Sequence, residues 1–172
     1  MEPGAVTRFG PRLAFVIFVG LTLHLSLFAT ARIGEVRPDV LLLIAVAGGI
    51  VGGAERGAVI GFVSGIAVDL FVHTPLGLSA LAFSLVAFAV GTVQSSVIRA
   101  AWWIPPATAW VASAAGILLY ALLGALIGRP EFLEPRVLGV AAGVATANAL
   151  LAPPLVRIMA WALPRDPDRS YA

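Results

Sequence analysis

GAVIGFVSGIAVDLFVHTPLGLSAL, residues 57–81, is almost wholly apolar up to Asp69 and then enters a proline-containing turn. Glycine recurs at every fourth residue before the acid, at Gly57, Gly61 and Gly65. In a helix this spacing places the three glycines and the acid along one side. Helices in lipid pack closely across such small residues. The stretch therefore predicts a membrane helix whose glycine side faces protein.

The composition of the whole chain is typical of a membrane protein. Of its 172 residues, 60% are hydrophobic and 12% are charged, with a mean hydropathy of +1.00, whereas a soluble domain carries about 25% charged residues. The absence of cysteine excludes disulfides and thiol chemistry. The net charge of +2 is spread along the sequence without a basic run, so nothing indicates nucleic-acid binding. We therefore expect an all-α integral membrane protein.

Six apolar segments are long enough to be considered as helices, which predicts a six-helix transmembrane bundle. They are residues 13–30, 40–54, 57–72, 78–98, 105–127 and 137–152. A single helix over 40–72 is excluded, because it would place Glu55 and Arg56 in the middle of the membrane. A tight hairpin at GGAERG is less costly. The second and third segments, about 23 to 24 Å long, are short for a hydrocarbon core of about 30 Å.

The two ends of the chain carry separate expectations. The first apolar segment has the features of a secretory signal, but further apolar segments follow it, so we expect a retained helix; cleavage would leave five spans. Pro153-Pro154 should end the last span, and residues 155–163 are typical of an interfacial helix. Residues 1–163 then form a single transmembrane domain. The polar residues 164–172 are expected to be a disordered cytoplasmic tail.

The distribution of arginine favours cytoplasmic termini. With six spans, seven of the eleven arginines fall on the side of the termini and four fall in the opposite loops. Arginine is enriched on the cytoplasmic side of membranes. Trp102, Trp103 and Trp161 fall on the same side as the termini, where indole rings prefer the interface. We therefore expect a multi-pass protein with both termini in the cytoplasm.

Asp69 is the one acid among nine that the sequence places well inside an apolar segment. A charge within the bilayer is costly unless it is paired, neutralised or near water. Three roles remain open for Asp69: anchoring the turn at 73–77, contacting a ligand or partner, and transporting protons. His24 lies at a comparable height on the first helix and is expected to meet Asp69.

His24 and Asn148 are otherwise expected to be internal hydrogen-bonding residues. No cysteine or second ligand is spaced to make His24 a metal ligand. Neither a Ser-His-acid constellation, a phosphate-binding loop nor a pair of catalytic carboxylates can be assembled inside the bundle. The sequence therefore argues against an enzyme, a metal site and a cofactor.

Three motifs follow one another between residues 37 and 91. A Pro-Asp pair opens the second helix, G-F-x-x-G-x-x-x-D runs through the third, and a P-x-G-x-x-A-L turn follows it. The motif positions are Pro38, Asp39, Gly61, Phe62, Gly65, Asp69, Pro75, Gly77, Ala80 and Leu81. In these motifs, its length and its number of spans, the chain resembles the rod shape-determining protein MreD family.

The resemblance implies a non-enzymatic membrane subunit of the bacterial cell-elongation complex, located in the cytoplasmic membrane and supporting side-wall peptidoglycan synthesis and rod shape. The implied partners are MreC, the transpeptidase and glycosyltransferase of that complex, and membrane lipid; participation of MreB is left open. The family is also similar to energy-coupling-factor S components, which leaves a vitamin-binding transporter subunit as the alternative. Such a subunit needs polar residues converging on a cavity, and their scarcity here favours a scaffold. The candidate structural or partner-binding residues are Asp69, His24, Asn148, Gly57, Gly61, Gly65, Pro75 and Gly77.

Overall fold

The computed structural model describes residues 10–30, 38–71, 75–96, 103–129, 132, 134 and 136–163. This part of the chain forms six helices: α1 (Pro11–Thr30), α2 (Val40–Gly52), α3 (Ala54–Phe71), α4 (Leu78–Ser96), α5 (Ile104–Leu126) and α6 (Arg136–Ala162). The predicted all-α class with six helices is confirmed for these residues. His73, Trp102 and the predicted tail at 164–172 lie outside them.

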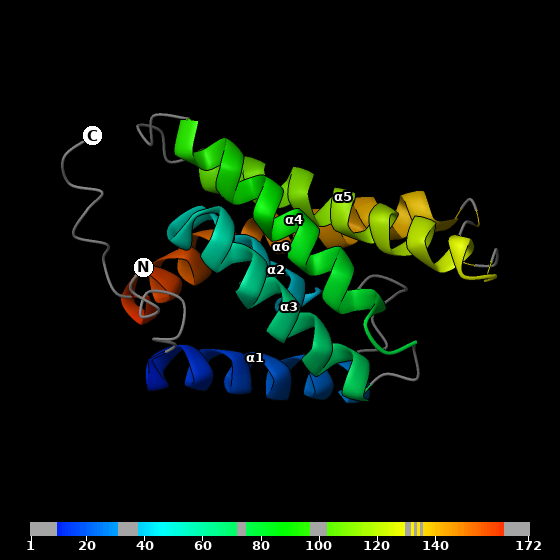
Figure 1. Ribbon diagram of the computed structural model, residues 1–172, viewed down its shortest axis with the longest axis horizontal. Helices are drawn as coiled ribbons and strands as arrows, with labels where there is room; N and C mark the ends of the chain where they lie inside the picture. Colours follow the sequence, from blue (N-terminus) through cyan, green and yellow to red (C-terminus); the bar gives the residue numbers. More distant parts are fainter. Residues whose placement is uncertain are drawn as a thin grey trace, which may run out of the picture.

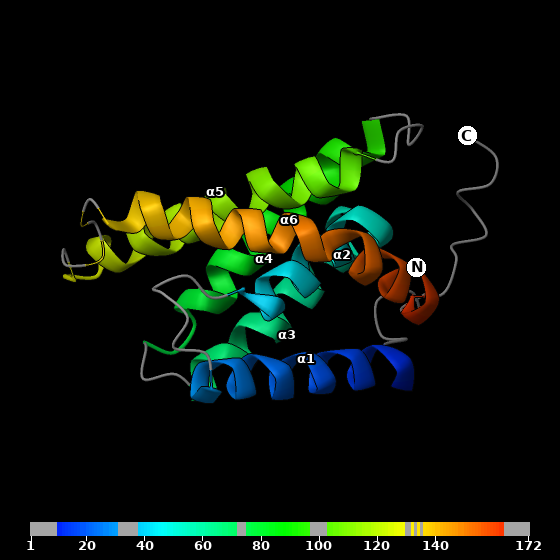
Figure 2. The ribbon, with the colours of Figure 1, turned by 180° about the vertical axis from the view of Figure 1, so that it is seen from behind.

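α2 is the central helix of the bundle. It contacts each of the other five helices, and eleven of its thirteen residues are buried. Figures 1 and 2 show α1 along one side of the molecule and α4, α5 and α6 along the other, with α2 and α3 between them. A helix surrounded in this way meets protein on all sides, which explains why α2 is apolar around its whole circumference.

Different helix termini lie at the two ends of the bundle. α1 begins, α2 ends, α3 begins and α6 ends at one end, which we call the terminal end (Figures 1 and 2). α3 ends, α4 begins and α5 ends at the other, which we call the distal end. The described chain therefore enters and leaves the bundle at the same end.

The glycine side of α3 makes backbone contact with α2 and α4. A Cβ built on Gly57 would lie 2.6 Å from the Cα of Gly49 in α2. A Cβ on Gly61 would lie 2.5 Å from the carbonyl oxygen of Phe83 in α4. A side chain at either position would therefore push two backbones apart. The glycine side is used inside the bundle, as its spacing predicts.

One residue, Gly53, connects α2 to α3. Its φ is 81°, a left-handed conformation that glycine adopts without the steric penalty of a Cβ. The chain turns here within the GGAERG sequence, where a hairpin is predicted. α3 begins before residue 57, so that Glu55 and Arg56 lie in its first turn.

The helices differ in whether they are long and apolar enough to cross a membrane. By length and composition, α5 and α6 are long and apolar enough to do so. Among the described residues, shorter apolar helices cover Pro11–Ser26, Val40–Gly52 and Leu78–Gln94. α2 is about 20 Å long at 1.5 Å per residue, which is less than a hydrocarbon core of about 30 Å. Its central position makes this length tolerable, because protein surrounds it.

The predicted break at Pro153-Pro154 is wrong. α6 continues through both prolines as one helix, Arg136–Ala162, so residues 155–162 belong to the same helix as the predicted last span. A proline removes a helical hydrogen bond, but neighbouring helices and local adjustment compensate for this in membrane proteins. Met159, beyond the prolines, is fully buried, so packing holds the second part of α6 against the bundle. Figure 2 shows that this red part changes direction relative to the first.

Candidate functional site

Asp69 lies near the end of α3 and caps the beginning of α4. Its carboxylate accepts hydrogen bonds from the backbone N–H groups of Gly77 at 2.8 Å, Ser79 at 3.2 Å and Ala80 at 3.4 Å. The residue is only 3% exposed. The first N–H groups of a helix have no partner within that helix, and a carboxylate there also interacts favourably with the helix dipole. Asp69 therefore fixes the end of one helix to the start of the next.

Gly77 explains why this cap comes from another helix. It precedes α4, where a capping side chain usually stands, but its φ of 95° favours glycine, which has no side chain to offer. Gly65, one turn before Asp69, allows the approach, because a Cβ there would collide with the backbone at the start of α4. The carbonyl of Pro75 accepts a hydrogen bond from the N–H of Leu78 at 3.2 Å. We call Gly65, Asp69, Pro75 and Gly77 the Asp69 turn.

His24 approaches Asp39, although the sequence predicts that it meets Asp69. The distance from His24 Nδ1 to Asp39 Oδ1 is 3.7 Å, and the His24 side chain is 4% exposed. The same Oδ1 accepts a hydrogen bond from the N–H of Leu42 at 3.0 Å, which makes Asp39 the N-cap of α2. The short α2 begins inside the bundle and brings its N-cap residue, Asp39, to the level of His24, whereas the carboxylate of Asp69 bonds to the start of α4.

Asn148 joins α6 to α5 and α2. The residue is fully buried, and its Nδ2 donates hydrogen bonds to the Oγ of Ser113 at 2.9 Å and to the backbone carbonyl of Asp39 at 3.2 Å. At 1.5 Å per residue, Asn148 lies about 18 Å from the start of α6, so the carbonyl of Asp39 meets α6 near the middle of that helix. We call His24, Asp39, Ser113 and Asn148 the Asp39 centre. Its contacts link α1, α2, α5 and α6.

Asp39 and Ser113 are not among the candidate site residues predicted from the sequence, although Asp39 is one of the motif positions. The hydropathy pattern alone assigns Asp39 to a loop, because it stands just outside an apolar segment. An acid directly before a long apolar run is, however, a common N-cap signature, and that signature identifies Asp39. Ser113 has no comparable signature, since a small hydroxyl in an alanine-rich helix is compatible with either a lipid-facing or a buried position.

The chemistry of these groups is that of helix anchoring. Each of the two acids bonds to N–H groups at the start of a helix, and Asn148 bonds across helices. Within the residues that the structure describes, no group of three or more histidine, aspartate or glutamate side chains could hold a metal ion. The arrangement therefore favours a role in holding helix ends in place.

The family model of the rod shape-determining protein MreD matches residues 7–159, a range that contains the Asp69 turn and the Asp39 centre. The chain belongs to the MreD family. No curated protein and no solved structure matches the chain, so the similarity to energy-coupling-factor S components that the resemblance implies has no support from a solved structure.

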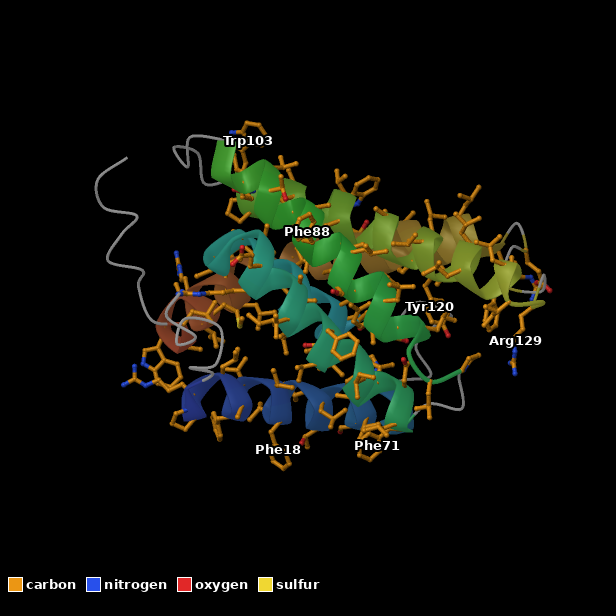
Figure 3. The ribbon with its side chains drawn as sticks, viewed as in Figure 1. Phe18, Phe71, Phe88, Trp103, Tyr120 and Arg129 are labelled. Atoms are coloured by element: carbon orange, nitrogen blue, oxygen red, sulfur yellow. The ribbon has the colours of Figure 1, made fainter. Side chains whose placement is uncertain are left out.

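Membership of the MreD family confirms the resemblance seen in the sequence. Proteins of this family are non-enzymatic, lie in the membrane and have a role in determining rod shape. The surface agrees with a membrane environment, because large apolar side chains are exposed along the helices. Phe18 is 67% exposed and Phe71 is 56% exposed, and Figure 3 shows both pointing away from the bundle. This MreD-family chain is therefore a non-enzymatic integral membrane protein.

Proposed function

We propose that this chain is a membrane subunit of the bacterial cell-elongation complex that binds MreC and supports side-wall peptidoglycan synthesis. The observation that carries the proposal is the match of the MreD model over residues 7–159. The transpeptidase and glycosyltransferase of the complex are the further partners, together with MreB where that filament is present. The chain holds these partners in position, and the partners carry out the chemistry.

We further propose that all six helices lie in the cytoplasmic membrane with both termini in the cytoplasm. The described arginines support this orientation. Three of them, Arg12, Arg56 and Arg157, lie at the terminal end, and two, Arg129 and Arg136, lie toward the distal end. Arginine is enriched on the cytoplasmic side. In this arrangement residues 1–163 form one transmembrane domain and residues 164–172 its cytoplasmic tail.

We propose that the Asp69 turn shapes the surface that MreC contacts. Large apolar side chains are exposed around it: Leu70 is 66% exposed, Phe71 is 56% exposed and Leu76 is 72% exposed. The hydrogen bonds of Asp69 fix the start of α4 relative to the end of α3, and therefore fix these side chains relative to one another. Binding energy is concentrated in a few large, well-positioned side chains, which this turn supplies.

Co-purification with MreC after solubilisation in a mild detergent tests the proposal. Leu76→Gln should reduce the recovery of MreC, whereas Leu126→Gln should leave it unchanged. Leu126 is the matched control, because it is 75% exposed and ends α5 at the distal end. Failure of the unaltered protein to retain MreC would refute membership of the complex. Equal recovery with the two variants would refute only the assignment of the surface.

A further inference from the structure

Arg12 and Trp161 form a contact between α1 and α6 at the terminal end. The central guanidinium carbon of Arg12 lies 5.0 Å from the centre of the Trp161 ring, which is within the range of a cation–π interaction. Trp161 is 56% exposed, and Arg12 is also exposed. Figures 1 and 2 both show the start of α1 beside the end of α6. The contact therefore lies on the surface of the bundle.

A second arginine, Arg157, lies on the same side of α6. It precedes Trp161 by four residues, and residues four apart in a helix are neighbours, with Cβ atoms about 5–6 Å apart. Arg157 is exposed. Among the described residues, no carboxylate lies within the 4.0 Å ion-pair distance of Arg12 or Arg157. Arg12 therefore lies over the indole ring and Arg157 stands one helical turn before it, and neither has a counter-ion from these parts of the chain.

Exposed apolar side chains lie next to the two arginines. Phe15, one turn after Arg12, is 62% exposed, and Ile158, next to Arg157, is 44% exposed. The start of α1 also contributes the positive end of its helix dipole. Glu55 and Arg56 in the first turn of α3 lie at the same end and balance each other in formal charge. A ligand for this surface needs a negative head and an apolar tail.

We propose that Arg12, Arg157 and Trp161 bind the phosphate headgroup of an anionic phospholipid in the leaflet at the terminal end. Guanidinium groups bind phosphate oxygens through paired N–H donors, and indole rings prefer the level of the headgroups. The acyl chains lie along Phe15 and Ile158. This inference rests on the chain being a membrane protein and does not depend on binding to MreC.

Native mass spectrometry of the purified full chain with added phosphatidylglycerol or phosphatidylcholine tests the site. The unaltered protein should retain one phosphatidylglycerol more tightly than phosphatidylcholine. Arg12→Gln and Arg157→Gln should each weaken its retention by about fivefold, and the double variant by about 25-fold. Arg129→Gln is the matched control, because Arg129 is also exposed and Figure 3 shows it at the opposite end of the bundle.

Three results would overturn the inference. Equal retention of the two lipids would show that anionic charge is not recognised. An equal effect of Arg129→Gln and Arg12→Gln would show that the charge acts without regard to position. Displacement of the lipid by inorganic phosphate at millimolar concentration would assign the site to a soluble anion. Thermal unfolding in detergent keeps the test decisive, because Arg157→Gln should leave the melting temperature unchanged, whereas Arg12→Gln also removes the contact with Trp161 and can lower it slightly.

Discussion

Replacing Gly61 by alanine tests whether backbone contact holds α3 to α4. The new Cβ would lie 2.5 Å from the carbonyl oxygen and 2.7 Å from the carbonyl carbon of Phe83. Ordinary van der Waals contact begins at 3.4 Å, so the oxygen and the Cβ would have to separate by the difference, 0.9 Å. The obstacle is a helix backbone and not a flexible side chain. Relief therefore requires the two helices to move apart.

The expected loss of stability follows from two opposing effects. Overpacking of a well-packed interior costs about 1–3 kcal/mol, and a rigid backbone obstacle favours the upper part of this range. Alanine gains at most about 1 kcal/mol over glycine in helix propensity. We therefore expect Gly61→Ala to lower the free energy of unfolding by about 1–2 kcal/mol. Gly139→Ala in α6 is the matched control, because a Cβ there meets nothing within 4 Å.

Denaturant titration of both variants in mixed micelles, followed by helical circular dichroism, measures this difference. Gly139→Ala should be as stable as the unaltered protein or slightly more stable, so the two alanine variants should differ by about 1–3 kcal/mol. If Gly61→Ala unfolds at the same denaturant concentration as Gly139→Ala, α3 and α4 do not approach as closely as the glycine side implies.

Four further predictions concern the polar anchors and the orientation. Asp69→Asn keeps one acceptor oxygen and should retain partial growth complementation. Asp69→Leu leaves buried N–H groups unpaired, which costs about 1–3 kcal/mol of unfolding free energy, and should abolish complementation. If the Asn variant is folded and binds MreC but loses growth as completely as the Leu variant, proton transport is favoured instead. Gly77→Ala places a Cβ on a residue with φ 95° and should lower the free energy of unfolding by about 1–2 kcal/mol; an unchanged value in denaturant titration would contradict the turn geometry. Asn148→Leu and Ser113→Ala should show a coupling of about 0.6 kcal/mol, and at most about 1.7 kcal/mol, in a double-mutant cycle of unfolding free energies; strictly additive effects would show that their hydrogen bond contributes nothing. Cysteines introduced singly into this cysteine-free chain should be labelled from the cytoplasm when placed at either terminus, and labelling of the C-terminus from outside would reject the proposed orientation.

The number of helices and the close packing of α3 are predictable because both have strong local causes. Apolar segments separated by charged or helix-breaking residues define helices in a bilayer, and glycine at every fourth residue leaves one helix side without side chains. The position of Asp69 near a turn likewise favours hydrogen bonds to that turn. These inferences need only the spacing of residues along one helix and the cost of burying charge.

The depth of α2 and the continuity of α6 depend on contacts between distant residues. Hydropathy shows that α2 is short, but only its burial among five helices shows that it begins inside the bundle, where Asp39 meets His24. The helix-breaking tendency of Pro153-Pro154 is a local property, and packing of Met159 overrides it. A sequence pattern assigns residues to helices more readily than it places one helix beside another.

Gly53 also determines the order in which this chain can be assembled during synthesis. A single residue separates α2 from α3, so we expect the two helices to enter the lipid together as a hairpin. The hydrogen bond between the carbonyl of Asp39 and α6 forms later, because its donor, the amide of Asn148, is synthesised 109 residues after Asp39. Insertion of the early helices and completion of their polar contacts are therefore separate events, and the second requires the last helix.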